Sequence, residues 1–139
     1  SNEELKKNYK LARSVRGVGL IISAMMLVTS HNFNAFDNAK KYNCYTGLAP
    51  FEHSSGTSIR GKMQTSYLAH KRMRAYLHNG ANSSYNHDPE MRVYYDRKIK
   101  EGKDHKLVMN AIACKIVSRV FAVVKRQTPY VSLYQQNFN

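Results

Sequence analysis

The sequence predicts a compact, mainly α-helical domain, and three observations support this fold class. A chain of 139 residues usually forms a single core. Apolar residues make up 42% of it and Gly and Pro together number only 10, which excludes the composition of a disordered chain. Apolar positions recur at helical spacing with no internal repeat. The longest apolar run, residues 18–29, is shorter than the roughly 20 residues of a bilayer span, so no membrane partner is expected.

The first two expected helices form a pair that resembles a helix-hairpin-helix. A helix over residues 3–14 has an apolar face that begins at Leu5, with basic residues around it. A second helix, residues 18–30, is so apolar that we expect it to be buried on most sides. Gly17, between them, can adopt the positive φ of a tight turn.

The turn between these helices is a candidate DNA-phosphate site. Gly17 and Gly19 let the backbone approach a phosphate closely, and the first N–H groups of the second helix carry partial positive charge. Arg16 adds a formal charge beside them. Two glycines also suit a plain pair of packed helices, so the pattern alone leaves both interpretations open.

The middle of the chain is expected to contain a short helix and then a loop. Asn34 or Asp37 can cap a helix that continues to about Tyr45. Residues 47–66 lose the helical period and collect small polar residues, which predicts a Ser-Gly loop or a short hairpin.

The second half of the chain is expected to be helical. A helix over residues 67–80 ends at Asn79-Gly80, and Asp88 followed by Pro89 predicts the start of a helix that ends near Gly102. A last helix covers about 104–126. Its expected buried positions are Leu107, Ala111, Cys114, Val117, Phe121 and Val124. The single domain, 1–139, therefore divides into a helix-hairpin-helix-like part, 3–46, the Ser-Gly loop, 47–66, a helical part, 67–126, and a polar tail, 127–139.

The charge points to nucleic acid. The chain carries 22 Lys and Arg against 9 Asp and Glu, a net charge of +13. Three stretches, 5–36, 53–87 and 105–139, contain no acidic residue at all. An excess of this size is the usual electrostatic signature of nucleic-acid binding, although a solvated basic surface is the plainer interpretation. The expected nucleic-acid contacts outside the hairpin are Arg60, Lys62, Lys71, Arg72 and Arg74.

The serines of the loop could carry chemistry only with help. A serine hydroxyl is a poor nucleophile unless a base, a metal or fixed cations assist it. Glu52 and His53 lie beside Ser54 and Ser55 and could move a proton. The loop does not have the order of a phosphate-binding Walker loop, and a flexible turn explains its composition equally well.

Metal and disulfide chemistry are not expected within this chain. The acidic residues are too few to converge on two Mg²⁺ ions, and the six histidines show no paired ligand spacing beyond His70 and His78, two turns apart. Cys44 and Cys114 are too far apart for a zinc site or disulfide framework, and they suit buried positions in a reducing cytoplasm. The sequence therefore predicts no metal site and no cofactor in this chain itself.

An ordered set of short motifs, spread over about residues 11–134, resembles a known family. It is similar to the C-terminal domain of the DEDD-type insertion-sequence transposases, the IS-one-ten group related to Piv-like invertases. The motifs are Val15-Arg16-Gly17-Val18-Gly19, Phe33-Asn34-Ala35-Phe36-Asp37-Asn38-Ala39, Tyr45-Thr46-Gly47-Leu48-Ala49-Pro50, Ser54-Ser55-Gly56, Arg60-Gly61 and Met73-Arg74.

The resemblance implies a recombinase whose serine lies in this chain. An N-terminal RuvC-like domain, absent here, would supply the acids and Mg²⁺, and the serine directly before Gly, Ser55, would form a phosphodiester with DNA. Ser54 is the second candidate. The resemblance also implies DNA as partner, a guide RNA for some members, a homo-oligomer when full length, and a place in the bacterial cytoplasm near the nucleoid. Many relatives have Gly-Asn before a Leu-Arg pair where this chain has Leu68-Ala69 before Met73-Arg74.

These observations leave three candidate functions, each of which can be tested. The first is the serine-bearing, DNA-binding half of a transposase, an enzyme when full length and inactive as this fragment. The alternative is a non-catalytic helical nucleic-acid-binding module in which the serine loop is only a turn. A third, a ribosome-associated basic protein, predicts a preference for RNA and indifference to Gly17 and Gly19.

Overall fold

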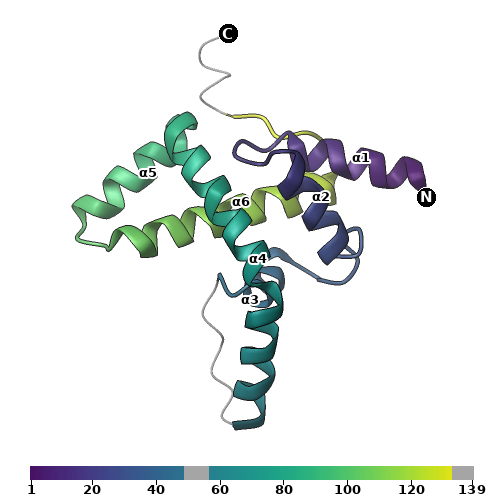
Figure 1. Ribbon diagram of the computed structural model, residues 1–139. Helices are drawn as coiled ribbons and strands as arrows, with labels where there is room; N and C mark the ends of the chain where they lie inside the picture. The colour runs from purple at the N-terminus through teal and green to yellow at the C-terminus, as the bar shows by residue number, and fades with distance from the viewer. Residues whose placement is uncertain (49–56, 133–139) are drawn as a thin grey trace.

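The computed structural model describes the backbone of residues 1–48 and 57–132, and the side chains of residues 1–48 and 70–132. Within these ranges the regular structure is helical, with no strand, which confirms the predicted mainly α fold. Figure 1 shows α4 crossing α6, with α5 to one side of the crossing and α1 and α2 to the other. The helices are α1 (Asn2–Arg13), α2 (Leu20–Thr29), α3 (Ala39–Tyr45), α4 (Thr57–His87), α5 (Pro89–Lys100) and α6 (His105–Arg126).

The centre of the fold is α6, which packs against α1, α3, α4 and α5. Among the described residues it is also the one helix long and apolar enough to cross a bilayer. Its contacts with four other helices account for that apolar composition, since a helix covered on several sides needs no polar face. Its buried residues are Val108, Met109, Ile112, Ala113, Ile116, Val117, Val120 and Val123.

The predicted buried face of α6 is partly wrong. Leu107, expected in the core, is 65% exposed, whereas Val108 and Met109 are buried. Because α6 is apolar around most of its circumference, its sequence does not mark one face, and packing decides which residues are covered. Of the other expected positions, Val117 is buried and the remaining four are half-buried: Ala111, Cys114, Phe121 and Val124.

The first two helices and their turn form as expected, but α2 is more exposed than predicted. Gly17 has φ +87° in the turn of residues 14–19. Leu20, Ile21 and Val28 are 60%, 56% and 69% exposed, so the expectation that α2 is buried on most sides is wrong. The physical reason is that α2 packs mainly against α1 and α4, and touches α3 through the hydrogen bond between Thr29 and Tyr42 at its end, so one side of it stays open.

The helix α4 departs most from the sequence-based expectation. It begins at Thr57, so the predicted loop over residues 47–66 is wrong from Thr57 onward. It also continues through Gly80 to His87, where a helix end was predicted. Gly80 is buried, and a Cβ atom there would lie 2.8 Å from the carbonyl oxygen of Gly17. Gly80 is therefore the point of close backbone approach between α4 and the turn of residues 14–19, and not a helix stop.

Two short helices begin at side-chain caps. The Oδ1 atom of Asn38 accepts from the backbone N–H of Lys41 at 2.9 Å and starts α3, so neither Asn34 nor Asp37 is the cap. Asp37 instead forms an exposed ion pair with Lys41 at 2.6 Å, which lowers the pKa of its carboxyl group. The predicted start of α5 is confirmed, because Asp88 accepts from the backbone N–H of Glu90 at 3.1 Å.

The two ends of the described chain are tied together. Gln127 donates from Nε2 to the Oδ1 atom of the buried Asn8 at 3.0 Å, and the backbone N–H of Tyr130 donates to Ser14 Oγ at 2.8 Å. The segment after α6, predicted as a polar tail, is therefore fixed to α1 and its C-cap at Gln127 and Tyr130, and Ser132 beyond them is buried. These contacts place Asn8 in the buried face of α1, while Leu5 is exposed.

Candidate nucleic-acid interface

The turn of residues 14–19 is hydrogen-bonded to the C-terminal end of α4. Arg16 donates from Nη1 to the carbonyl oxygen of His87 at 3.1 Å, and Ser84 donates from Oγ to the carbonyl oxygen of Arg16 at 3.2 Å. A Cβ atom on Gly17 would lie 2.7 Å from the carbonyl oxygen of Gly80. The positive φ of Gly17 and its lack of a side chain are thus required by packing against α4, whatever the turn binds.

Gly19 is different, because it is open to solvent. A Cβ atom on Gly19 would meet nothing within 4 Å. Gly19 is the N-cap of α2, and no side chain caps the first N–H groups of that helix. Free N–H groups at a helix start attract anions. Of the three residues predicted in the hairpin, Gly19 is therefore the one whose surroundings leave room for a phosphate.

Two predicted basic residues lie at the other end of the contact between α2 and α4. Lys71 and Arg72 are exposed and line a hollow of about 600 Å³ together with Met25 and Thr29 of α2; we call it the α2–α4 hollow. Gly17 meets Gly80, whereas the end of α2 meets the residues near 71, so the two helices run antiparallel. At 1.5 Å per residue, the hairpin contact and Lys71 are roughly 13 Å apart along α4.

The aromatic side chains beside the α2–α4 hollow are uncharged. The rings of Tyr45 and His70 stack with centroids 3.5 Å apart. Partial burial lowers the pKa of His70 and raises the pKa of Tyr45, so both side chains are neutral at pH 7. The positive charge of the α2–α4 hollow therefore comes from Lys71 and Arg72. The third predicted cation of this segment, Arg74, is half-buried and already interacts with other groups.

The structure does not describe the side chains of the remaining predicted site residues. Ser54 and Ser55 fall within 49–56, which is not described. Arg60 and Lys62 belong to the first turns of α4, but their side chains are not described either. Their roles remain predictions.

Among the described residues, no group of three or more His, Cys, Asp and Glu side chains could hold a metal ion. The donor set for the Mg²⁺ that the family resemblance implies is therefore not found in residues 1–48 and 70–132. Cys44 and Cys114 are free and half-buried, and burial raises the pKa of the Cys114 thiol to about 11. The Cys114 thiol is therefore not suited to nucleophilic attack at neutral pH.

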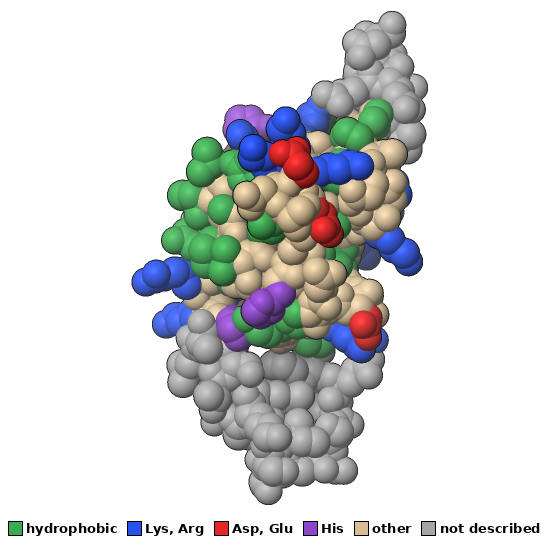
Figure 2. Space-filling view, turned by 90° about the vertical axis from the view of Figure 1, so that its right-hand side faces the viewer, with side chains coloured by type: hydrophobic (Ala, Val, Ile, Leu, Met, Phe, Trp, Pro, Cys, Tyr) green, Lys and Arg blue, Asp and Glu red, His purple; other side chains and the backbone are tan. Residues whose placement is uncertain are grey.

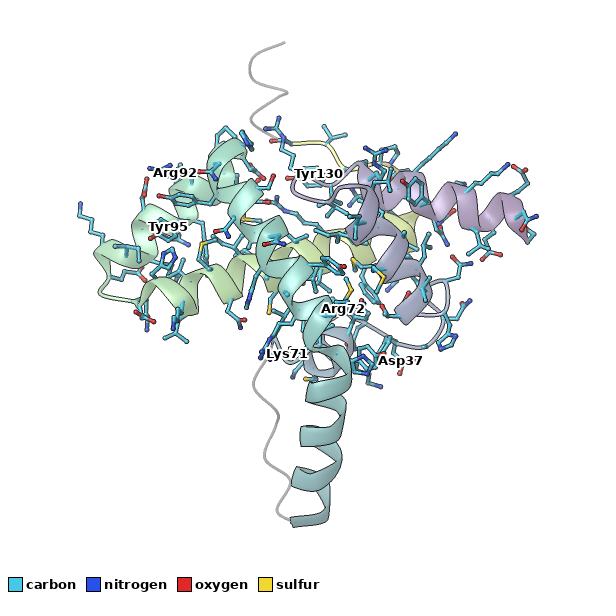
Figure 3. All side chains as sticks on the ribbon, in the orientation of Figure 1. Asp37, Lys71, Arg72, Arg92, Tyr95 and Tyr130 are labelled. Carbon is cyan, nitrogen blue, oxygen red and sulfur yellow. The ribbon has the colours of Figure 1, made fainter. Side chains whose placement is uncertain are left out.

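The structure also gathers cations that the sequence analysis did not single out. Arg97, Lys98 and Lys115 surround the ring of Tyr94, between α5 and α6. Figure 3 shows how far α5, marked by Arg92 and Tyr95, lies from Lys71 and Arg72 on α4. In α5 the sequence offered one signal of this cluster, since Tyr94 is followed by basic residues three and four positions later. Lys115 comes from α6 and could not be linked to them from the sequence.

The basic residues are spread over several helices, from α1 to α6, and do not come from one segment. On the face in Figure 2, Lys and Arg side chains lie mostly around the edge, and Asp and Glu are few. The described acids are largely taken up by ion pairs, such as Arg92 with Asp96 and Lys98 with Glu101. Most of the positive charge is thus left without a counter-charge of its own.

Comparison with known proteins gives a consistent result. A family model described as "Transposase IS116/IS110/IS902 family" matches residues 9–96, more than half of the chain. The chain is 34% identical over 119 residues to the insertion element IS110 43.6 kDa protein of Streptomyces coelicolor, covering 86% of this chain and 29% of that protein.

Two further relatives extend the comparison. The chain is 28% identical over 128 residues to the pilin gene-inverting protein of Moraxella bovis, covering 91% of this chain and 40% of that protein. It is 30% identical over 125 residues to the insertion element IS900 42 kDa protein of Mycobacterium paratuberculosis, covering 89% and 31%. The chain therefore spans less than half of the length of each of these relatives.

Proposed function

Because this chain belongs to the Transposase IS116/IS110/IS902 family, we propose that it is the DNA-binding, serine-bearing part of a transposase that moves an insertion sequence. The observation that carries the proposal is the net charge of +13 in a chain of this family. The name of the Moraxella relative, a pilin gene-inverting protein, is consistent with DNA rearrangement. The chain corresponds to the C-terminal domain of the DEDD type, and DNA is its partner.

In the proposed reaction, the Oγ atom of Ser55 attacks a DNA phosphorus. A bond from Oγ to phosphorus forms, one bond from phosphorus to a deoxyribose oxygen breaks, and that oxygen takes up a proton while the serine loses its own. Attack by a free DNA hydroxyl on the phosphoserine reverses these changes and joins a new strand. The serine precedes the first residue of α4 by two positions, and a helix start favours the negative charge that develops on phosphorus oxygens.

The rest of the proposal concerns what lies outside this chain. A RuvC-like domain elsewhere in the full-length protein supplies the acids and Mg²⁺, so this fragment alone is inactive. The full-length protein works as a homo-oligomer in the bacterial cytoplasm near the nucleoid, and a guide RNA encoded by the element is a further partner.

Duplex binding by this chain is expected to be strongly salt-dependent and independent of DNA sequence. Four to six phosphate contacts predict a slope of log K against log salt near −4 to −5, at about −0.9 per contact. Fluorescence anisotropy of a labelled duplex in a salt series measures the slope. A slope close to zero, or no binding at low salt, would contradict the electrostatic argument.

The hairpin is expected to bind phosphate through its backbone. Gly19→Val should weaken duplex binding about fivefold, because a branched side chain blocks the start of α2, and an anion at a helix N-terminus contributes about 1 kcal/mol. Gly19 has φ −90° and open surroundings, so the variant should fold, as circular dichroism can verify. Lys100→Ala, which removes an exposed charge at the end of α5, is the control and should change binding by less than about twofold. Equal losses from both variants would favour a general charge effect.

A further inference from the structure

A second hollow lies between α5 and α6, away from the hairpin and from the α2–α4 hollow. It has a volume of about 510 Å³, within the range of small-ligand sites. We call it the α5–α6 hollow. Its wall includes Met91, Val93, Tyr94, Arg97, Lys115 and Ser118.

Two cations in this hollow have no acidic partner among the described residues. The guanidinium carbon of Arg97 lies 5.6 Å from the ring centroid of Tyr94, and the Nζ atom of Lys115 lies 4.6 Å from it. Lys98 approaches the same ring at 5.8 Å, but it is paired with Glu101 at 3.3 Å. Positive charges that share one ring repel one another, and the ring returns only about 0.5–1 kcal/mol per exposed cation. An anion bound in the hollow would supply the counter-charge that Arg97 and Lys115 lack.

The acids nearest to the hollow are already occupied. Asp88 is buried, and its Oδ2 atom lies 2.9 Å from Nη1 of Arg119. Glu90, at the edge of the hollow, lies 3.0 Å from Nη2 of the same guanidinium. Because Asp88 also caps α5, this three-residue cluster fixes the start of α5 on α6. The hollow is thus held open between two anchored helices.

The wall beside the cations is apolar. Met91 is buried, Val93 is 56% exposed and Tyr94 is half-buried, and all three line the hollow. A duplex presents its phosphates but keeps its bases stacked inside, so it would leave this wall uncovered. An unpaired nucleotide can place a phosphate on the cations and its base on the apolar and aromatic wall.

We propose that the α5–α6 hollow binds one nucleotide of an unpaired nucleic-acid strand, with its phosphodiester between Arg97 and Lys115 and its base against Tyr94 and Val93. This inference rests on the proposed function only in taking nucleic acid as the partner. It assigns a different ligand, a single strand, to a surface that the hairpin does not reach. Unpaired DNA and unpaired RNA share the chemistry that this hollow recognises.

The test uses the chain with the double variant Arg97→Gln and Lys115→Gln. Both side chains are exposed, so folding should be unaffected. Binding of labelled single-stranded DNA and single-stranded RNA should weaken about tenfold, and the slope of log K against log salt should fall by about 1.4, from two contacts at about 0.7 each. Duplex binding should change by less than about threefold. The probe with the larger loss identifies the natural strand.

The matched control is Lys100→Gln with Lys106→Gln, which removes two exposed charges outside the hollow. It should lower single-strand binding by less than about threefold. Tyr94→Leu should weaken single-strand binding about fivefold or more, because base–aromatic stacking contributes about 1–3 kcal/mol, while Tyr94→Phe retains it.

Two results would overturn the inference. One is that the wild-type chain fails to bind either single strand at low salt. The other is that the hollow variant and the control variant lose single-strand and duplex binding equally. The effect would then come from net charge and not from a site in the hollow. A chain that binds single strands through the hollow but does not bind duplex would support this inference and contradict the proposed duplex function, so the two failures are distinguishable.

Discussion

Replacing Ser55 with alanine in the full-length transposase is expected to abolish the covalent protein–DNA intermediate and to lower strand cleavage by at least about 10⁴-fold. The reason is that the hydroxyl removed is the proposed attacking group, without which the bond to phosphorus does not form. DNA cleaved by the wild-type enzyme in Mg²⁺, with any required RNA, should remain attached to the peptide that contains Ser54 and Ser55. Mass spectrometry of the trapped adduct measures this.

The control for this experiment is Ser54→Ala, which removes the neighbouring hydroxyl and should leave the adduct in place. DNA binding by both variants should equal that of the wild type, since the proposed loss concerns chemistry. An adduct on a tyrosine such as Tyr67, or cleaved ends with no protein attached, would contradict the serine mechanism. Full activity of Ser55→Ala would favour a non-catalytic binding module.

Gly17→Val is expected to lower the free energy of unfolding by roughly 3–5 kcal/mol, and the melting temperature by about 10–20 °C. Two costs add. A branched residue is strained at φ +87°, and its Cβ atom would lie 2.7 Å from the carbonyl oxygen of Gly80 in α4. Backbone cannot give way as a flexible side chain can. Thermal unfolding followed by circular dichroism measures the loss.

The variant Gly102→Val separates the cost of positive φ from the cost of the steric clash. Gly102 has φ +90° in the turn before α6, but a Cβ atom there would meet nothing within 4 Å. Its replacement should therefore cost only the strain of a side chain at positive φ, about 1–2 kcal/mol. If the two variants were equally destabilised, the close approach of Gly17 to α4 would not matter. The comparison also shows why a loss of DNA binding in Gly17→Val could not be assigned to a lost phosphate contact.

The parts of the fold that the sequence predicts well are those with local signals. Asp88 followed by Pro89 starts α5 because a cap and a residue without an N–H act within one turn. Gly80 was misjudged for the opposite reason. Asn-Gly usually ends a helix, but here the missing side chain serves the contact with Gly17, which is distant in sequence. A single sequence does not show which distant backbone will need the space.

The candidate sites, too, differ in whether their signals are local in the sequence. The turn that contains Gly17 and Gly19 was predictable because both glycines lie in one short segment, although only Gly19 is free of packing; its role in binding phosphate stays a prediction. The α5–α6 hollow was not predicted, because its cations come from two helices that meet only in the fold. Arg16 has an obvious positive charge in the sequence, yet its guanidinium is partly engaged by the carbonyl oxygen of His87.

The central position of α6 has a consequence for biosynthesis. Residues 9–96, the part that the family model matches, do not include α6, yet α1, α3, α4 and α5 all pack against that helix. As the ribosome releases the chain from its N-terminal end, these four helices emerge before the surface that they need. Folding is therefore completed only once α6 and the contacts of Gln127 and Tyr130 have left the exit tunnel. Until then the nascent chain exposes the apolar surface that α6 will cover, so the segment that the family model matches is smaller than the unit that folds.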